Sequence, residues 1–473
     1  MGERAIASTN GYRLGLDWSN PPEGIDIQAL TQAMNCEFDR TDNALRTVSG
    51  VTIAYDAGMS IDTLYYDVYR HKWYFTHGIE LYETDLKTRK RLGTLTGQHK
   101  PKYHAYSGDI LIASGGKLQA ISGTGELSMV DGSPSCEIVS SHAGRVLVAS
   151  IYSHRLTWSA IGDYHSWENN KNDSSSGQYL DVGYKDKGAI VAVDFLARAI
   201  IVYKEYGKVY QVVGTPDEGN LSVYPLSSTG FCSGSAINID ARSYYLGEQG
   251  LMSFMPTNTY AEIQPFETGL NINSYLLTYV GKDCEMWHCP SRKQLWIKPH
   301  NGGGIFLYHY LPRYQDGRGV FTSRQFVYDV HDVVDVNKNI YVAYGNKIGV
   351  LDDRTDLDDG QQIETSIVSG NRLAMRLFVL IMNYNFVTHN LIDGYGSVQI
   401  SDKTPKPVTF ASKSTRTYYA DERTFSADDK LNVNEYTKVY KIGGGANRNV
   451  QFKIHVQKGA ISLRQLDYTY EEV

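Results

Sequence analysis

The chain has 473 residues, a formal net charge of −6 and a pI near 6.1. The length allows two or three domains, while the charge excludes an overall basic surface for gripping nucleic acid. The five scattered cysteines exclude a dense disulfide framework, and the longest apolar run, 377–382, is too short to cross a membrane.

The N-terminus has no apolar segment of the kind that a secretory signal needs, so we expect synthesis in a reducing cytoplasm. We predict that residues 1–50 are an extended segment that leads into a repeat region. Helix-forming patterns are scarce throughout the chain, and the best candidate for one short helix is 22–38.

Residues 51–353 contain seven copies of one pattern, a short apolar strand, a turn that often holds glycine, and an alternating strand. Their starts lie 37, 36, 54, 44, 51 and 45 residues apart, and short apolar strands precede several of them. Three to four strands in each 40–50 residues are typical of propeller blades, so we predict a β-propeller of six or seven blades. The N-terminal segment is a candidate to complete the last blade. The seven copies are 72–85, 109–122, 145–160, 199–214, 243–255, 294–310 and 339–353.

The sequence pattern changes after residue 353, where the hairpin repeats end. Residues 354–362 are predicted to be an acidic, turn-rich linker, because neither the spacing nor the flanks fit a calcium loop. From 363 to 473 the strands are longer and are separated by Asp, Asn, Gly and Pro. We predict a separate antiparallel β-sandwich there, which makes the whole chain all-β.

The only basic run of the chain contains Lys87, Arg89, Lys90 and Arg91. It follows the strand of the first hairpin, so its simplest interpretation is a solvated loop. The functional alternative is contact with DNA phosphates or with an acidic partner.

The stretch RLTWSAIGDYHSWENN is similar to the Asp-box of sialidases, a Ser-x-Asp-x-Gly-x-x-Trp turn. However, Ile161 stands where the box requires Asp two residues after Ser159, and no other hairpin repeats the box. We therefore interpret the stretch as structural. The predicted turn residues are Gly162 and Asp163, and the residues predicted to pack the blade edge are Trp158 and Trp167.

No other pattern meets the requirements of a catalytic, metal or cofactor site. Cys284, His288 and Cys289 lack a fourth zinc ligand, and adjacent strand residues point to opposite faces. The chain has no Gly-x-Ser-x-Gly nucleophile elbow. We predict a protein that is not an enzyme and has no cofactor.

The layout of propeller, acidic linker and sandwich resembles the tail nozzle or hub proteins of short-tailed bacteriophages, the P22-type packaged DNA stabilization family. Three segments carry the resemblance: NCEFDRTDNALRTVSGV, RLTWSAIGDYHSWEN and IIVYKEYGKVYQVVGTP. The resemblance implies a structural virion protein made in the host cytoplasm. It implies a homo-oligomer, a hexameric ring below the portal, with viral DNA passing through the central channel. The implied partners are adaptor or connector proteins, tail fibres and a plug or needle.

A second hypothesis stays open. Propellers also bind or hydrolyse glycans, so a receptor-binding or sialidase-like role is the alternative to the tail hub. Glycan turnover by a stable monomer would favour this alternative, whereas rings formed alone or with an adaptor would favour the hub. In the hub, a slightly negative channel would let DNA slide.

Overall fold

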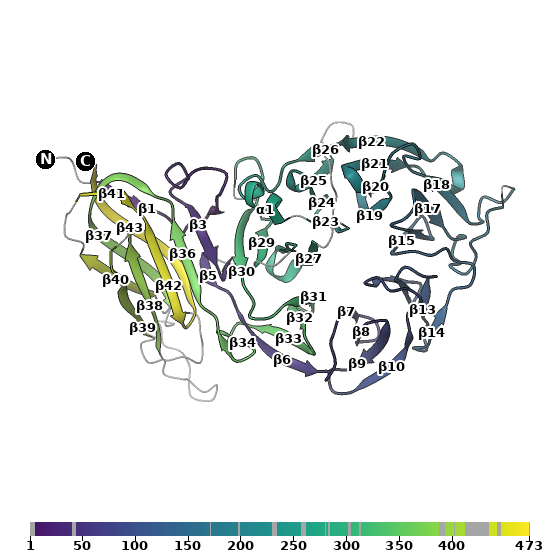
Figure 1. Cartoon of the computed structure of the whole chain (residues 1–473), viewed down its shortest axis with the longest axis horizontal. Helices are drawn as coiled ribbons and strands as arrows, with labels where there is room; N and C mark the ends of the chain where they lie inside the picture. Colours follow the sequence, from purple (N-terminus) through teal and green to yellow (C-terminus); the bar gives the residue numbers. More distant parts are fainter. Residues whose placement is uncertain are drawn as a thin grey trace, which may run out of the picture.

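Seven antiparallel blades of four strands each stand around a common axis, which Figure 1 shows nearly end-on. Five of the blades are separate four-stranded sheets, and the other two are parts of larger sheets. The computed structural model describes residues 5–39, 44–170, 172–196, 199–228, 234–256, 262–279, 281, 284–300, 304–311, 314–386, 393–401, 403–411, 435–441 and 446–472. Every predicted hairpin forms the two middle strands of one blade, so the propeller is confirmed, and it has seven blades in these residues.

Blades 1 to 4 consist of consecutive strands. Each inner strand begins on the same face of the ring, which we call the upper face, and the turn between the second and third strands lies on that face too. The strands are β7 (Thr63–Asp67), β8 (Lys72–His77), β9 (Glu80–Thr84) and β10 (Arg89–Thr94); β11 (Lys102–Tyr106), β12 (Asp109–Ala113), β13 (Gln119–Ile121) and β14 (Leu127–Met129); β15 (Ile138–His142), β16 (Arg145–Ala149), β17 (Arg155–Trp158) and β18 (Gln178–Asp181); and β19 (Ile190–Leu196), β20 (Ala199–Lys204), β21 (Lys208–Val213) and β22 (Ser222–Ser228).

Blades 5 and 6 follow the same order, and blade 7 takes its outer strand from the start of the chain. Strand β6 (Gly50–Asp56) pairs antiparallel with β33 and closes the ring. The strands are β23 (Ala236–Ile239), β24 (Arg242–Gly247), β25 (Gly250–Pro256) and β26 (Ile263–Phe266); β27 (Glu285–Cys289), β28 (Gln294–Lys298), β29 (Ile305–His309) and β30 (Val320–Arg324); and β31 (Val330–Val336), β32 (Asn339–Tyr344) and β33 (Lys347–Asp352).

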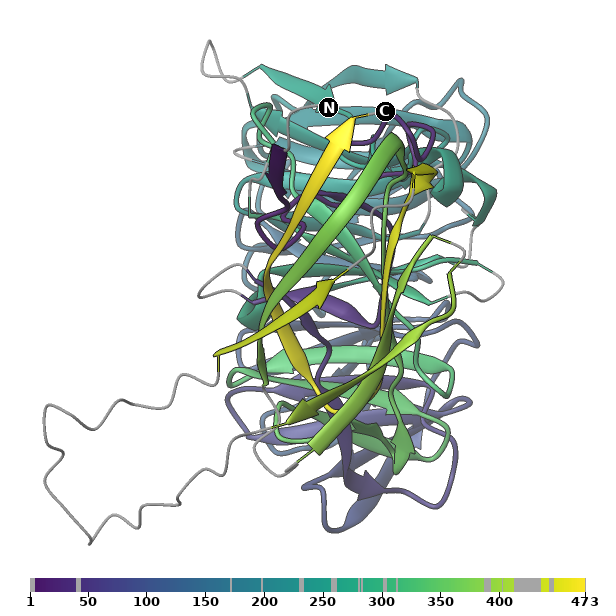
Figure 2. The same cartoon turned by 90° about the vertical axis from the view of Figure 1, so that its left-hand side faces the viewer.

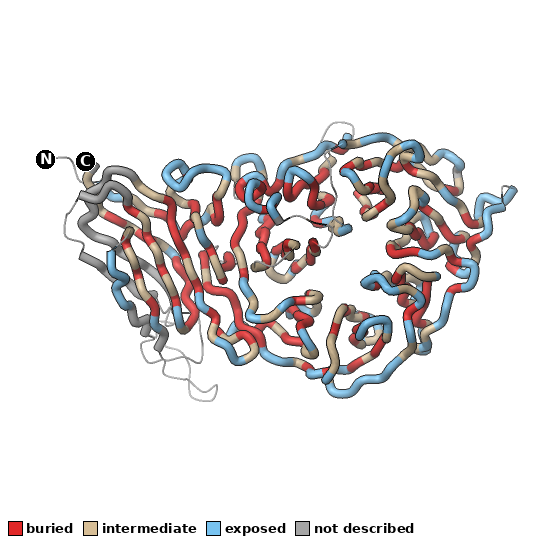
Figure 3. The backbone as a smooth tube through the Cα atoms, viewed as in Figure 1, coloured by how far each residue is buried: buried red, intermediate tan, exposed pale blue. Residues whose placement is uncertain are grey.

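The apolar side chains of each blade are buried against its neighbours, and a core cluster fills each of the seven interfaces. The cluster between blades 5 and 6 extends into the C-terminal sheets. Figure 3 shows the buried residues along each blade. The alternating strands therefore have two buried faces, and the outer strands are the more exposed part of each blade. Because a lone four-stranded sheet would leave both apolar faces in water, closure of the ring is what stabilises every blade.

The first 50 residues, predicted as an extended segment that leads into the repeat region, also contribute strands to the C-terminal sheets. Strands β1 (Ala5–Ser8) and β5 (Leu45–Thr47) pair with β43 (Ile461–Glu472) near the C-terminus. Strand β3 (Ala29–Met34) pairs antiparallel with β36 (Thr365–Ser369). The short helix considered at 22–38 is wrong, because β3 and β4 (Cys36–Phe38) occupy that segment.

Residues 363–472 contribute to two sheets, which lie in front of the propeller in Figure 2. One sheet contains β43 and β37 (Arg372–Phe386), and the other contains β36 and β42 (Phe452–Lys458). The rings of Phe452 and Tyr468, one from each sheet, lie 5.0 Å apart. The separate β-sandwich stays a prediction, because both sheets share strands with the first 47 residues. The remaining strands are β2 (Gly15–Leu16), β38 (Asp393–Ile400), β39 (Lys406–Ala411), β40 (Glu435–Lys441) and β41 (Ala446–Val450).

The predicted linker 354–362 is also part of a sheet. Strand β34 (Leu357–Asp358) pairs parallel with β6 and antiparallel with β35 (Gln361–Gln362). The buried Asp358 carboxylate accepts a hydrogen bond of 3.0 Å from Arg324, a buried residue of blade 6. This acidic stretch is therefore bound to the propeller. Among the described helices, the longest being α1 (Asn273–Tyr279), none is long and apolar enough to span a membrane.

Candidate functional site

The predicted turn at Gly162 and Asp163 lies in the connection between β17 and β18 of blade 3. Gly162 has a φ of 68°, in the left-handed region that favours glycine, and its N–H donates a 2.8 Å hydrogen bond to Gly144 O. The Asp163 carboxylate accepts a 2.9 Å hydrogen bond from His165 N–H. These hydrogen bonds fix a tight turn. The turn lies on the face of the propeller opposite the upper face, which we call the lower face.

The two tryptophans of this segment pack on opposite faces of blade 3. Trp158 is fully buried and belongs to the core cluster shared with blade 4, whereas Trp167 belongs to the cluster shared with blade 2. The Trp167 indole N–H donates a 2.7 Å hydrogen bond to Tyr164 O. The structure thus gives both rings a packing position, one in each interface of the blade.

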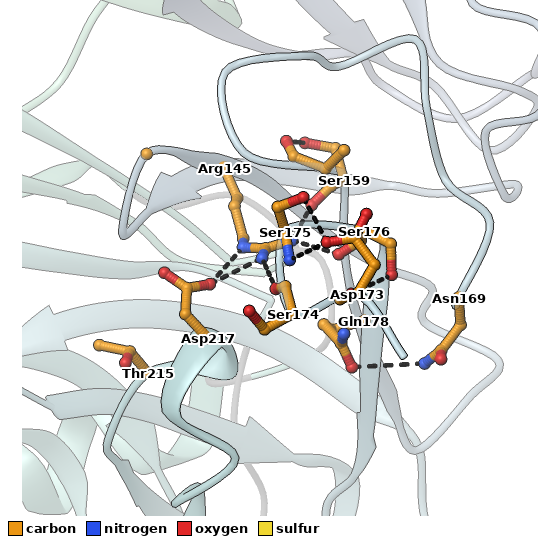
Figure 4. Close-up of polar contacts among 12 residues, drawn as sticks. Arg145, Ser159, Asn169, Asp173, Ser174, Ser175, Ser176, Gln178, Thr215 and Asp217 are labelled. Atoms are coloured by element: carbon orange, nitrogen blue, oxygen red, sulfur yellow. Dashed lines mark hydrogen bonds and ion pairs between the residues drawn. The ribbon is translucent and has the colours of Figure 1, made fainter. Parts of the chain in front are cut away.

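Arg145 is fully buried and directly follows Gly144, the residue that accepts the hydrogen bond from Gly162. Figure 4 shows its guanidinium among Ser159, Ser174, Ser176 and Asp217. Its guanidinium donates to Asp217 of blade 4 through Nε, at 2.9 Å, and through Nη2, at 2.7 Å. It also donates to the carbonyl oxygens of Ser159, Ser174 and Ser176. All five of its N–H groups are therefore engaged. This arginine has no free N–H with which to bind the carboxylate of a sialoside.

The basic run forms an edge of blade 1 and is not the loop that the sequence predicted. Arg89, Lys90 and Arg91 belong to β10, which pairs with β9, while Lys87 lies in the preceding turn. The sequence pattern misses this strand because both of its faces meet solvent, so no apolar alternation marks it. Arg91 pairs with Glu80 at 2.6 Å, and charged residues on such an edge oppose pairing with another sheet.

Cys284 and Cys289 are buried thiols in the interfaces of blade 6, and the His288 ring lies 3.2 Å from the Tyr310 hydroxyl (Nε2 to Oη). Burial raises the pKa of the Cys289 thiol well above its usual value. Such a thiol stays protonated and unreactive. Among the other cysteines, Cys36 and Cys136 are also buried, and Cys232 lies outside the described residues.

An ion pair on the upper face crosses the centre of the propeller, where the inner strands begin; we call this position the mouth. Lys100 precedes the inner strand of blade 2, and its ammonium lies 2.7 Å from Glu285 at the start of the inner strand of blade 6. It also donates a 2.7 Å hydrogen bond to His331 O in blade 7. Blades 2 and 6 are three positions apart, the largest separation in a ring of seven. The Lys100 side chain therefore links inner strands on opposite sides of the mouth.

Lys102 lies beside this bridge at the start of β11. Burial within the mouth, reinforced by the nearby Lys100 ammonium, lowers the pKa of Lys102, while Asp332 and Glu285 act in the opposite direction. Asp332 accepts hydrogen bonds of 2.9 Å from Leu64 N–H in blade 1 and from the Trp287 indole in blade 6. Asp332 thus joins blades 1, 6 and 7 at the mouth.

Three tyrosines on the upper face of blades 3 and 4 are largely exposed. Tyr152 is 74%, Tyr184 72% and Tyr206 65% exposed. They lie in the turn between β16 and β17, in the loop between β18 and β19, and in the turn between β20 and β21. We call these residues the tyrosine surface.

The sequence patterns did not predict these three positions. Tyr152 and Tyr206 lie in turns at the ends of apolar strands, in the stretches IYSH and EYG, and Tyr184 lies in the loop GYKDKG after β18. A large aromatic residue in a turn, outside the alternation of the strands, is the signal that could have found them. The bridge from Lys100 to Glu285 had no such signal, because 185 residues separate the partners.

The sequence matches no family model and no curated protein. The extracellular domain of the one component system BT4673 from B. thetaiotaomicron is 9% identical over 90% of this chain and 62% of that domain, with a TM-score of 0.46. The Neurospora crassa Pan2 WD40 domain is 11% identical over 66% of this chain and 97% of that domain, with a TM-score of 0.39. The Doa1 WD40 propeller is 11% identical over 65% of this chain and 97% of that domain, with a TM-score of 0.39. These likenesses concern the fold alone, and the chain spans less than two thirds of the length of the BT4673 domain.

Proposed function

We propose that this protein is a structural subunit of a bacteriophage tail, a nozzle or hub that joins other tail proteins and catalyses no reaction. The resemblance of the propeller, linker and C-terminal segments to such proteins suggests the role. The observation that supports it best is the rigid junction between the propeller and the two C-terminal sheets. A protein that holds several tail proteins in fixed positions needs a propeller and C-terminal sheets that do not move relative to each other.

The junction begins with a continuous sheet. Strand β30, the outer strand of blade 6, pairs with β3 at Met34 and Ser323, and β3 continues into β36 and β42. The Ser323 hydroxyl adds a 3.1 Å hydrogen bond to Ala33 O. Bending the C-terminal sheets away from the propeller would break this ladder.

A buried ion network reinforces the junction. The Glu37 carboxylate on β4 accepts hydrogen bonds from Arg46 on β5, from Arg292 in blade 6 and from Gln294 of β28. Arg292 also pairs with Asp353 after blade 7, at 2.7 Å. Because a buried carboxylate without partners is costly, this network disfavours any opening of the junction.

In the proposed assembly the chain forms a ring, a hexamer by resemblance, beneath the portal and its adaptor in the virion. Tail fibres and a plug or needle would dock on it, and viral DNA would pass through the channel of the ring. The test is mass photometry and electron microscopy of the purified chain, alone and mixed with a tail adaptor protein. Closed rings on the adaptor are the expected result. A chain that stays monomeric in both samples would overturn the proposal.

The glycan-binding alternative has one observation in its favour. Exposed tyrosine rings, such as those of the tyrosine surface, are suited to contact with sugar rings as well as with proteins. A glycan array separates the two functions. Specific retention of one glycan class, lost when Tyr152, Tyr184 and Tyr206 are replaced by alanine, would favour the alternative.

A further inference from the structure

The tyrosine surface is held rigidly by buried contacts beneath it. The buried Lys204 ammonium donates hydrogen bonds to Val182 O at 3.1 Å and to Gly183 O at 2.8 Å, and it lies 3.1 Å from His154 Nδ1. One buried side chain therefore fixes both the loop that carries Tyr184 and the turn that follows Tyr152.

The aromatic rings themselves are also positioned. The Tyr184 ring stands edge-on to His154, with centroids 6.5 Å apart, and the Tyr152 hydroxyl lies 3.2 Å from His99 Nε2. Tyr206 has a φ of 66°, a left-handed conformation that a bulky residue rarely adopts, and its ring closely approaches Gly188. Side chains fixed in advance lose little entropy when a partner binds.

The loop that carries Tyr184 is basic, with lysines at 185 and 187, although the chain as a whole carries −6. Lys185 and Lys187 are exposed. Within the described residues, neither ammonium group lies within salt-bridge distance of a carboxylate, whereas the neighbouring Lys208 does. The neighbouring Asp186 is paired with Lys208 at 2.6 Å. The Glu137 carboxylate accepts a 3.0 Å hydrogen bond from Ile151 N–H.

We propose that the tyrosine surface binds an acidic segment of a partner protein. Its carboxylates would lie against Lys185 and Lys187 and accept hydrogen bonds from the tyrosine hydroxyls, while its apolar side chains would pack on the rings. Tyrosine is enriched at protein interfaces because its ring gives contact area and its hydroxyl gives direction. This inference deepens the proposed function, on which it rests, by naming one docking surface and the chemistry of its occupant.

The test is a display selection of random twelve-residue peptides on three proteins. These are the wild type, the triple variant Tyr152→Ala, Tyr184→Ala and Tyr206→Ala, and a matched control, Tyr69→Ala, Tyr224→Ala and Tyr395→Ala. The control removes three tyrosines that are also exposed, but in the turn after β7 and on strands β22 and β38. The wild type and the control are expected to enrich peptides rich in Asp and Glu, and the first triple variant is not.

The best peptide is then measured by fluorescence anisotropy. We expect the dissociation constant to rise at least tenfold in the triple variant, about twofold or less in the control, and markedly with salt. Enrichment of neutral or basic peptides, no enrichment on the wild type, or equal binding by both variants would overturn the inference. So would tighter binding of a single-stranded dT15 oligonucleotide than of any peptide. Rings that form normally under any of these outcomes would leave the proposed hub function standing.

Discussion

Replacing Arg145 by methionine is expected to lower the free energy of unfolding by about 3 kcal/mol, because it leaves buried acceptors without donors. Methionine keeps most of the apolar stem, so the loss comes from the guanidinium. Among its acceptors, Ser159 is fully buried, whereas Ser174 is exposed and the Asp217 side chain is 33% exposed. Water can replace the arginine at the last two, which keeps the cost at the lower end of the range for a broken buried ion pair.

Two further variants separate the contributions of the charge and of the hydrogen bonds to this loss of stability. Arg145→Lys keeps the charge but offers three donors in place of five, so we expect an intermediate loss of about 1–2 kcal/mol. Asp217→Asn keeps an acceptor at a partly exposed position and should cost about 1 kcal/mol or less. Urea unfolding followed by near-ultraviolet circular dichroism, which reports on the packing of Trp158 and Trp167, measures all three. A loss below about 1 kcal/mol for Arg145→Met, or equal losses for Arg145→Met and Asp217→Asn, would refute the reasoning.

Gly162→Val should lower the free energy of unfolding by about 2 kcal/mol. The loss comes from backbone strain alone, since no atom lies within 4 Å of the added Cβ. Gly162→Asn should lower it clearly less, and comparison of the two unfolding free energies tests this. Burial by itself would raise the pKa of Glu37, but Arg292, Arg46 and Gln294 lower it to about 2. Ionised Glu37 therefore stabilises the fold fully above about pH 4.5, and this stabilisation, about 3 kcal/mol, is lost as the pH falls towards 2. When the free energy of unfolding is measured against pH, Glu37→Gln should lack this part of the acid destabilisation. The same acid dependence in the variant and the wild type would contradict the assignment. Glu285→Gln should change stability by less than about 1 kcal/mol, because both partners of its ion pair are partly exposed. Lys100→Met should raise the pKa of Lys102 by removing a like charge, which a nuclear magnetic resonance titration of the lysine side chains would detect; a pKa that stays the same or falls would be inconsistent with this account.

The propeller hairpins could be predicted from the sequence because their signals are local. In 199–214, for instance, an apolar strand, a turn at Tyr206 and Gly207, and an alternating strand lie within sixteen residues, and the structure has β20 and β21 there. The outer strands were harder to predict, as β10 illustrates. An edge strand with both faces in water has no reason to alternate.

The candidate site was predicted only in part. The turn residues Gly162 and Asp163 follow from local chemistry, and the structure places them in a turn. Whether Arg145 is buried, or Tyr184 exposed, depends on which loops of neighbouring blades cover them. That information is not contained in the spacing of residues along one strand.

The sequence by itself determined that this chain is built of β-strands, that seven hairpins repeat along it, and that this repeat pattern ends after residue 353. Only the tertiary structure decided how the ring closes and how its ends are joined. The pairing of Gly50 with Asp352 and of Leu30 with Ser369 links residues about three hundred positions apart. The helix considered at 22–38 gives way to β3 for this reason, since pairing with β36 outweighs local propensity. Such pairings are stabilised by surfaces that exist only once the other strands are in place, so they leave no periodic trace in the sequence.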